Sequence, residues 1–79
     1  MRQLRPFVVF AFDSTRTSLA AESALVAAGF TVKAMPLPPQ RGGLCGIALR
    51  LLPQEEQAAR GALHAHGIQV AARDEIQDF

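Results

Sequence analysis

The chain has 79 residues, of which 49% are hydrophobic and 19% are charged, and this composition excludes a disordered tail and favours one globular domain. A chain this short buries about 60–65% of the surface that its unfolded form exposes, so its core is small. A homodimer, which would bury more surface, is therefore one expected state. Eight basic and seven acidic residues leave a net charge of +1, which argues against nucleic-acid binding.

Cysteine content and hydropathy indicate the compartment. One cysteine cannot form a disulfide within the chain, so the sequence predicts a cytoplasmic protein. The apolar run of residues 7–12 is too short for a secretory signal, and no segment approaches the roughly 20 apolar residues that cross a bilayer. We therefore expect no membrane association.

The first strand and the first helix are predicted from residues 7 to 29. Residues 7–12 are aromatic, β-branched or small without polar alternation, which is typical of a strand in the middle of a sheet. Residues 13–15 supply side-chain oxygens that can cap a first helical turn. Residues 17–28, rich in alanine and leucine, predict the helix, and Gly29 ends it.

This helix has two apolar ridges. Ala21, Leu25 and Ala28 fall at the spacing of one helical face and are the expected buried stripe. Leu19 and Val26 form a second ridge on a different side. The small alanines would let the helix lie close to the sheet.

The middle of the chain predicts two further strands. Residues 30–35 alternate apolar and polar side chains, and the prolines at 36, 38 and 39 remove backbone donors, which suits an edge strand or its exit. Residues 47–52 alternate as a third strand, with Arg50 on the face opposite Ile47 and Leu49.

The last part of the chain predicts a helix and a strand. Pro53 suits the first position of a helix, because its missing amide is one that the helix leaves unpaired. His66 shares a face of this helix with its apolar residues, and Gly67 ends it. Residues 68–72 alternate as a fourth strand, and residues 74–79 are interpreted as a C-terminal tail.

The element order is strand, helix, strand, strand, helix, strand. It predicts one α+β domain over residues 1–79 with the ferredoxin-like βαββαβ topology. Right-handed crossovers would place both helices on one face of a four-stranded antiparallel sheet. In this topology the start of the first helix, the connection between the second and third strands, and the end of the second helix meet at one end of the sheet.

The connection between the second and third strands carries the only cysteine, Cys45. Neighbouring glycines leave few side chains to cover its thiol, and the start of the first helix with its arginine would favour a thiolate or a bound anion. We therefore predict Cys45 as the reactive residue. The predicted binding residues are Gly42, Gly43, Gly46, Ser14, Thr15, Arg16, Arg41, Arg50 and His66.

Each candidate also has a structural interpretation. A lone cysteine is often a small buried hydrophobe, and His66 is more simply a partly covered residue in the last helical turn than a general base for Cys45. Arg50 and Arg60 are most simply solvated charges. His64 and His66 point to opposite sides of their helix, so we expect no metal site. No phosphate-binding or dinucleotide motif occurs, and we expect no cofactor.

Several segments form a specific combination, and the most telling is a proline-rich strand exit followed by a lone Cys-Gly that opens a strand. These segments are Phe12-Asp13-Ser14-Thr15 before Leu19 and Ala21-Glu22, then Ala28-Gly29-Phe30, Met35-Pro36-Leu37-Pro38, Cys45-Gly46-Ile47-Ala48-Leu49-Arg50 and Gly67-Ile68. Together they resemble the Se/S carrier protein-like family of small, mostly bacterial proteins. Gly42 and Gly43 stand where similar proteins tend to have serines.

The resemblance implies a carrier rather than a turnover enzyme. Cys45 would accept sulfur or selenium as a persulfide or perselenide and hand it to another protein. Its donor would be a cysteine desulfurase or a relay protein of the sulfurtransferase type. The residues alone leave alternatives open: a non-enzymatic module that senses an anion or an amino acid at the start of the first helix, or an interaction module with a structural cysteine.

Overall fold

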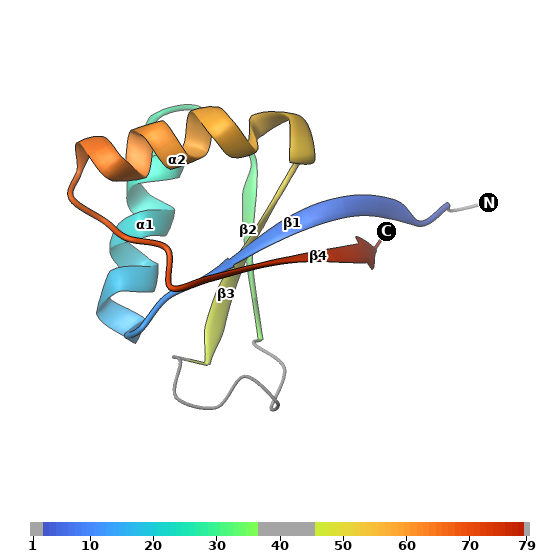
Figure 1. Ribbon diagram of the computed structural model, residues 1–79, viewed down its shortest axis with the longest axis horizontal. Coiled ribbons are helices and arrows are strands. Elements are labelled where there is room, and N and C mark those ends of the chain that lie inside the picture. The colour runs from blue at the N-terminus through green and yellow to red at the C-terminus, as the bar shows by residue number, and fades with distance from the viewer. Residues whose placement is uncertain (1–2, 37–45, 79) are drawn as a thin grey trace.

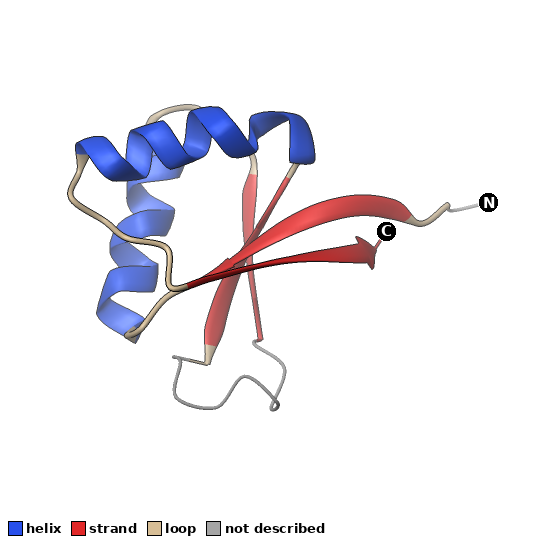
Figure 2. Cartoon of the chain, viewed as in Figure 1, coloured by secondary structure: helices blue, strands red, loops and turns tan. Residues whose placement is uncertain are grey.

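A four-stranded antiparallel sheet with two α-helices on one face forms the protein (Figures 1 and 2). The computed structural model describes residues 3–36 and 46–78. Its elements are β1 (Arg5–Ala11), α1 (Thr15–Ala27), β2 (Val32–Pro36), β3 (Ile47–Leu51), the 3-10 helix η1 (Pro53–Glu55), α2 (Glu56–Ala65) and β4 (Ala72–Asp78). The strand order is β2-β3-β1-β4, and each neighbouring pair is antiparallel. The predicted ferredoxin-like α+β fold is confirmed.

The core lies between the helices and the middle of the sheet. Val8 and Phe10 of β1, with Phe12 just after it, pack in one cluster with side chains of both helices and of β3. The helix residues in this cluster are Ala21, Leu25, Ala59 and Leu63. Burying one large apolar side chain contributes about 1.5–3 kcal/mol, so this cluster accounts for much of the stability of so small a domain. β1 lies between β3 and β4, as its uninterrupted apolar run predicts.

Both helices end in the same backbone motif. The Phe30 amide donates to the Leu25 carbonyl at 3.0 Å after Gly29, whose φ is +91°. The Ile68 amide likewise donates to the Leu63 carbonyl at 2.9 Å after Gly67, whose φ is +70°. Glycine has no Cβ to clash in this left-handed conformation, which makes it the usual residue of such a cap. The two predicted helix ends are confirmed.

The inner face of α1 differs in part from the prediction. Ala21 and Leu25 are fully buried, but Ala28 is exposed because it is the C-cap residue, where the chain leaves the helix. The third buried position is Ser18, one turn before Ala21. Leu19, on the other ridge, is 51% exposed.

The fourth strand lies further along the chain than predicted. Residues 68–71 form an irregular connection whose Ile68 and Val70 pack against the core, so their apolar alternation is not that of a strand. β4 is instead Ala72–Asp78, which includes most of the segment 74–79 that was interpreted as a tail, and it pairs with β1 over its whole length. The tail interpretation is therefore wrong for residues 74–78, and Phe79 lies outside the described residues.

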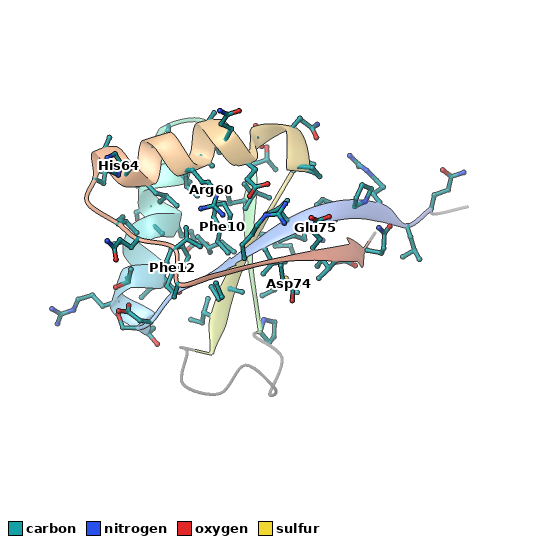
Figure 3. All side chains as sticks on the ribbon, viewed as in Figure 1. Phe10, Phe12, Arg60, His64, Asp74 and Glu75 are labelled. Carbon is teal, nitrogen blue, oxygen red and sulfur yellow. The ribbon has the colours of Figure 1, made fainter. Side chains whose placement is uncertain are left out.

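Ion pairs explain how such a charged segment forms a strand. On the helix side of β4, Arg73 binds Glu56 of α2 and the neighbouring Glu75. Figure 3 shows Glu75 on the edge strand β4 and Arg60 of α2 beside Phe10. The Arg60 Cζ lies 4.9 Å from the Phe10 ring centroid.

Within the described residues, neither helix has the length and apolar character that crossing a bilayer requires.

Candidate functional site

Part of the predicted site lies outside the described residues. Arg41, Gly42, Gly43 and Cys45 belong to this part, so their predicted roles stay predictions. The described part of the site begins at Gly46, the residue that follows Cys45. It continues into β3 and includes the first turn of α1, which the sequence places near this connection.

The N-terminus of α1 is capped as the sequence predicts, but it begins two residues earlier. Ser14 is the N-cap, and its Oγ accepts a hydrogen bond from the Thr17 amide at 3.1 Å. The same Oγ lies 2.9 Å from the Thr17 hydroxyl. Thr15 is the first helical residue and is exposed. The cap satisfies one free amide of the first turn, where the positive end of the helix dipole favours an anionic group.

A buried serine joins this helix to the strand that follows Cys45. Ser18 is fully buried, and its Oγ donates to the carbonyl oxygen of Ile47 at 3.1 Å. Ile47 is the first residue of β3 and the second residue after Cys45. The first turn of α1 is therefore attached to the beginning of β3, as the topology predicts.

Gly46 lies at the surface, directly before β3. It is exposed, and a Cβ built on it would meet nothing within 4 Å. The surface at Gly46 is therefore open, while its predicted role as a binding residue and the predicted accessibility of the Cys45 thiol stay predictions.

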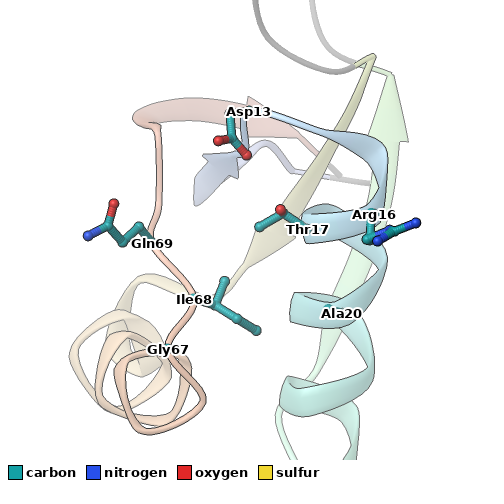
Figure 4. Close-up of a pocket in the computed structure, with 7 residues that line it drawn as sticks. All are labelled: Asp13, Arg16, Thr17, Ala20, Gly67, Ile68 and Gln69. Atoms are coloured by element: carbon teal, nitrogen blue, oxygen red, sulfur yellow. The ribbon is translucent and has the colours of Figure 1, made fainter.

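A hollow of about 370 Å³ separates the first turn of α1 from the connection after α2 (Figure 4). Thr17 points from the helix toward Gln69 on the opposite wall, while Arg16 points away from the hollow. The lining residues are Asp13, Arg16, Thr17, Ala20, Gly67, Ile68 and Gln69. The connection after α2 and the start of α1 therefore lie on opposite sides of one hollow, at the same end of the domain, as predicted.

Arg50 lies on the helix-free face of the sheet. Its Nη1 donates to Oδ2 of Asp78 at 2.7 Å, and its Cζ lies 4.1 Å from the centroid of the Phe7 ring. The Arg50 side chain is 18% exposed, so the interpretation as a solvated charge is wrong. Because β1 lies between β3 and β4, the arginine spans β1 and covers Phe7. Its role as an anion ligand stays a prediction.

His66 does not lie where its helical spacing predicts. It is the C-cap residue of α2 and is exposed, because the chain turns at Gly67 and brings Ile68 onto the core instead. His64 is also exposed, and it lines a second hollow on the other side of the connection with Arg60, Gln69 and Val70. His66 is in the lining of neither hollow.

The resolved pKa shifts lie away from this site. The Arg73 guanidinium, which donates to both carboxylate oxygens of Glu56 at 2.6 and 2.9 Å, lowers the pKa of Glu56. These hydrogen bonds raise the pKa of Arg73 in turn. The pair joins α2 to β4 and is structural.

Ser18 is the main residue that the sequence reasoning missed. A signal was present, because Ser18, Ala21 and Leu25 have the spacing of one helical face, so a polar residue continues the buried stripe. A buried hydroxyl at such a position requires a hydrogen-bond partner. The topology offers one at the beginning of β3.

The comparisons with known proteins agree with the motifs. The model of a family described as putative Se/S carrier protein-like matches residues 7–73. No curated protein and no solved structure matches the chain. The matched segment runs from β1 to the second residue of β4 and includes Cys45, Ser18 and Ile47. The chain belongs to the Se/S carrier protein-like family.

Proposed function

We propose that the protein carries sulfur or selenium on Cys45 as a persulfide or perselenide and delivers it to a partner protein. Membership of the Se/S carrier protein-like family supports this proposal. The observation that carries it further is the 3.1 Å hydrogen bond from Ser18 to Ile47, which attaches the positive end of α1 to the strand that follows the cysteine. Gly46, between Cys45 and that strand, is exposed and uncrowded.

The proposed reaction is an exchange between sulfur atoms. The Cys45 thiolate attacks the terminal sulfur of a donor persulfide, R–S–SH, and forms a new S–S bond. The S–S bond of the donor breaks, and the donor leaves as the thiolate R–S⁻. Cys45 then carries –S–SH with the proton of the transferred sulfur. The atom moves without a change in oxidation level, so no external oxidant or reductant takes part. A donor of the form R–S–SeH delivers selenium by the same exchange.

Delivery reverses these roles. A thiolate of the acceptor protein attacks the terminal sulfur on Cys45, and Cys45 leaves as the thiolate, ready for another cycle. The protein needs no further catalytic group for either exchange. The first turn of α1 would favour the thiolate that both steps require, because the positive end of a helix dipole stabilises an anion.

The loading step is tested by mass spectrometry of the intact protein. The protein is incubated with a cysteine desulfurase and cysteine, and in parallel with selenocysteine as the substrate. We expect a mass gain of one sulfur atom or one selenium atom, which Cys45→Ser abolishes. An unmodified wild-type chain, under conditions where the desulfurase turns over, would contradict the proposal.

The hollow beside α1 favours a second candidate function, the binding of a small anion or amino acid. The Thr17 hydroxyl lies at the positive end of α1, which suits an anion or the carboxylate of an amino acid, whereas the Asp13 carboxylate suits the ammonium group of an amino acid and disfavours a simple anion. A thermal-shift measurement with free amino acids and inorganic anions separates the two candidates. Stabilisation by one of these compounds that persists in Cys45→Ala supports ligand binding. If none of the amino acids or anions stabilises the protein, this second candidate is contradicted.

A further inference from the structure

The outer face of α1 carries a stripe with the spacing of a coiled-coil seam. Arg16, Leu19, Ser23 and Val26 follow one another at intervals of three, four and three residues, and all four are exposed. Leu19 and Val26 are 51% and 58% exposed, and they are two of the three large exposed hydrophobic residues in the described part of the chain. The buried face of the same helix consists of Ser18, Ala21 and Leu25. α1 therefore has one stripe for its own core and a second stripe toward solvent.

The charges of α1 are arranged unfavourably for an isolated helix. Its first turn contains Arg16 and no acidic residue, and its last turn contains no basic residue. A cation at the positive end of the dipole is destabilising, and the negative end has no cation of its own. An antiparallel neighbour of the same sequence corrects both faults, because it brings its Arg16 beside the last turn.

We propose that the outer stripe of α1 (Arg16, Leu19, Ser23 and Val26) is a docking surface for the same stripe of a second copy of the chain, packed antiparallel across a two-fold axis. The stripe is symmetric about Ala21, the midpoint of Thr15–Ala27, so the two helices overlap along their whole length. Leu19 then lies against the small Ser23 of the second copy. The aliphatic part of Arg16 lies against Val26, and its guanidinium reaches the last turn.

The expected dimer is weak. A helix of 13 residues is about 20 Å long, and one such contact buries less surface than a standard stable interface. Glu22 flanks the stripe, so the two Glu22 carboxylates approach each other across the axis. This like-charge contact weakens the pair further, and the substitution Glu22→Gln is expected to tighten it.

The test is sedimentation equilibrium of the full chain from about 10 µM to about 1 mM, with far-UV circular dichroism to show that each variant is folded. The wild type is expected to show a reversible equilibrium between monomer and dimer. Val26→Lys places a cation against Arg16 of the second copy, whereas Val26→Glu places a carboxylate there. We expect the first variant to associate at least about tenfold more weakly than the second.

Leu4→Lys is the matched control, because Leu4 is the third large exposed hydrophobic residue of the described part and lies outside α1. It is expected to associate like the wild type. A wild type that stays monomeric over the whole range would overturn the proposal. Equal effects of Val26→Lys and Val26→Glu would also overturn it, since a parallel or unrelated contact does not bring Arg16 to Val26. If Leu4→Lys associated as weakly as Val26→Lys, the proposal would also be overturned.

Discussion

Ser18 and Ile47 are joined by a hydrogen bond of 3.1 Å between the serine hydroxyl and the isoleucine carbonyl. Ser18 lies in the first turn of α1 and is fully buried, and Ile47 opens β3 two residues after Cys45. The bond therefore fixes the start of the helix to the described end of the connection that carries the cysteine. It is the closest link between the fold and the proposed chemistry within the described residues.

Removing this hydroxyl should destabilise the protein. Ser18→Ala takes away a donor in a fully buried position, and the expected loss in the free energy of unfolding is about 1–2 kcal/mol. Urea denaturation measures it. Ser23→Ala on the same helix is the control, because Ser23 is exposed, and its expected change lies within about 0.5 kcal/mol. Equal losses for the two variants would show that the Ser18 bond contributes nothing particular.

Two glycines of the second helical region should respond to alanine in opposite directions. Gly61 lies inside α2, and a Cβ there would meet nothing within 4 Å, so Gly61→Ala should stabilise by about 0.5–1 kcal/mol. Gly67 has a φ of +70°, so Gly67→Ala should destabilise by about 1–2 kcal/mol. Thermal unfolding followed by circular dichroism checks both. The assignment of the helix end would fail if Gly67→Ala were neutral.

Acid should weaken the link between α2 and β4. Hydrogen bonds from Arg73 hold the pKa of Glu56 below its ordinary value of 4.5, so this pair stabilises the folded state above pH 4.5. That contribution is lost as the pH falls through the lowered folded pKa. The difference in unfolding free energy between the wild type and Glu56→Gln should therefore be largest near neutral pH and should decrease as the pH falls.

The two arginine partners of Glu56 provide the comparison. Arg73→Gln should reproduce this pH dependence, because Arg73 makes bonds of 2.6 and 2.9 Å to both carboxylate oxygens. Arg60→Gln should have a smaller effect, because its contact is 3.3 Å long and its side chain is 46% exposed. Urea denaturation between pH 7 and pH 3 measures all three variants. A difference that stays constant with pH would contradict the assignment.

Arg50 should contribute to stability through two contacts. Arg50→Ala removes both the stacking on Phe7 and the ion pair with Asp78, with an expected loss of about 1–2 kcal/mol. Asp78→Asn keeps the stacking, and its expected loss is below about 1 kcal/mol, because the Asp78 side chain is 42% exposed. Chemical denaturation of both variants checks the order. A loss for Asp78→Asn as large as that for Arg50→Ala would show that the ion pair, and not the stacking, dominates.

Much of the fold could be predicted from local pattern. The apolar run of residues 7–12 gave the central strand, the prolines after residue 35 placed β2 at the sheet edge, and Gly29 and Gly67 marked the helix ends. Each of these features depends on the chain's own backbone preferences or on the burial of one segment. Such features are visible in a single sequence.

The fourth strand could not be predicted in this way. Ile68 and Val70 alternate like a strand but pack on the core from an irregular connection, while residues 74–79, which follow Arg73, were interpreted as a tail. The partners of Arg73 and Asp78 are Glu56 and Arg50, which lie 17 and 28 positions earlier. Long-range ion pairs of this kind override local propensity and leave no local pattern.

In the candidate site, too, local features could be predicted and features that depend on the rest of the fold could not. The N-cap at Ser14 could be predicted, because a capping residue acts on the turn that follows it. The exposure of His66 could not, because the turn at Gly67 gives its place on the core to Ile68. Ser18 is a polar residue in an otherwise apolar stripe, so the spacing of apolar residues alone does not assign it to the buried face of α1.

The most direct test of sulfur carriage is delivery from Cys45 to a second protein. The chain is loaded with one sulfur atom, separated from its donor, and mixed in equal amount with a sulfurtransferase-type relay protein that has its own acceptor cysteine. Intact-mass spectrometry then follows both chains. A carrier loses one sulfur atom while the acceptor gains one, and Cys45 returns as a free thiol that can be loaded again. Sulfur that stays on Cys45, or leaves only as free sulfide while the acceptor mass is unchanged, would contradict the proposed function.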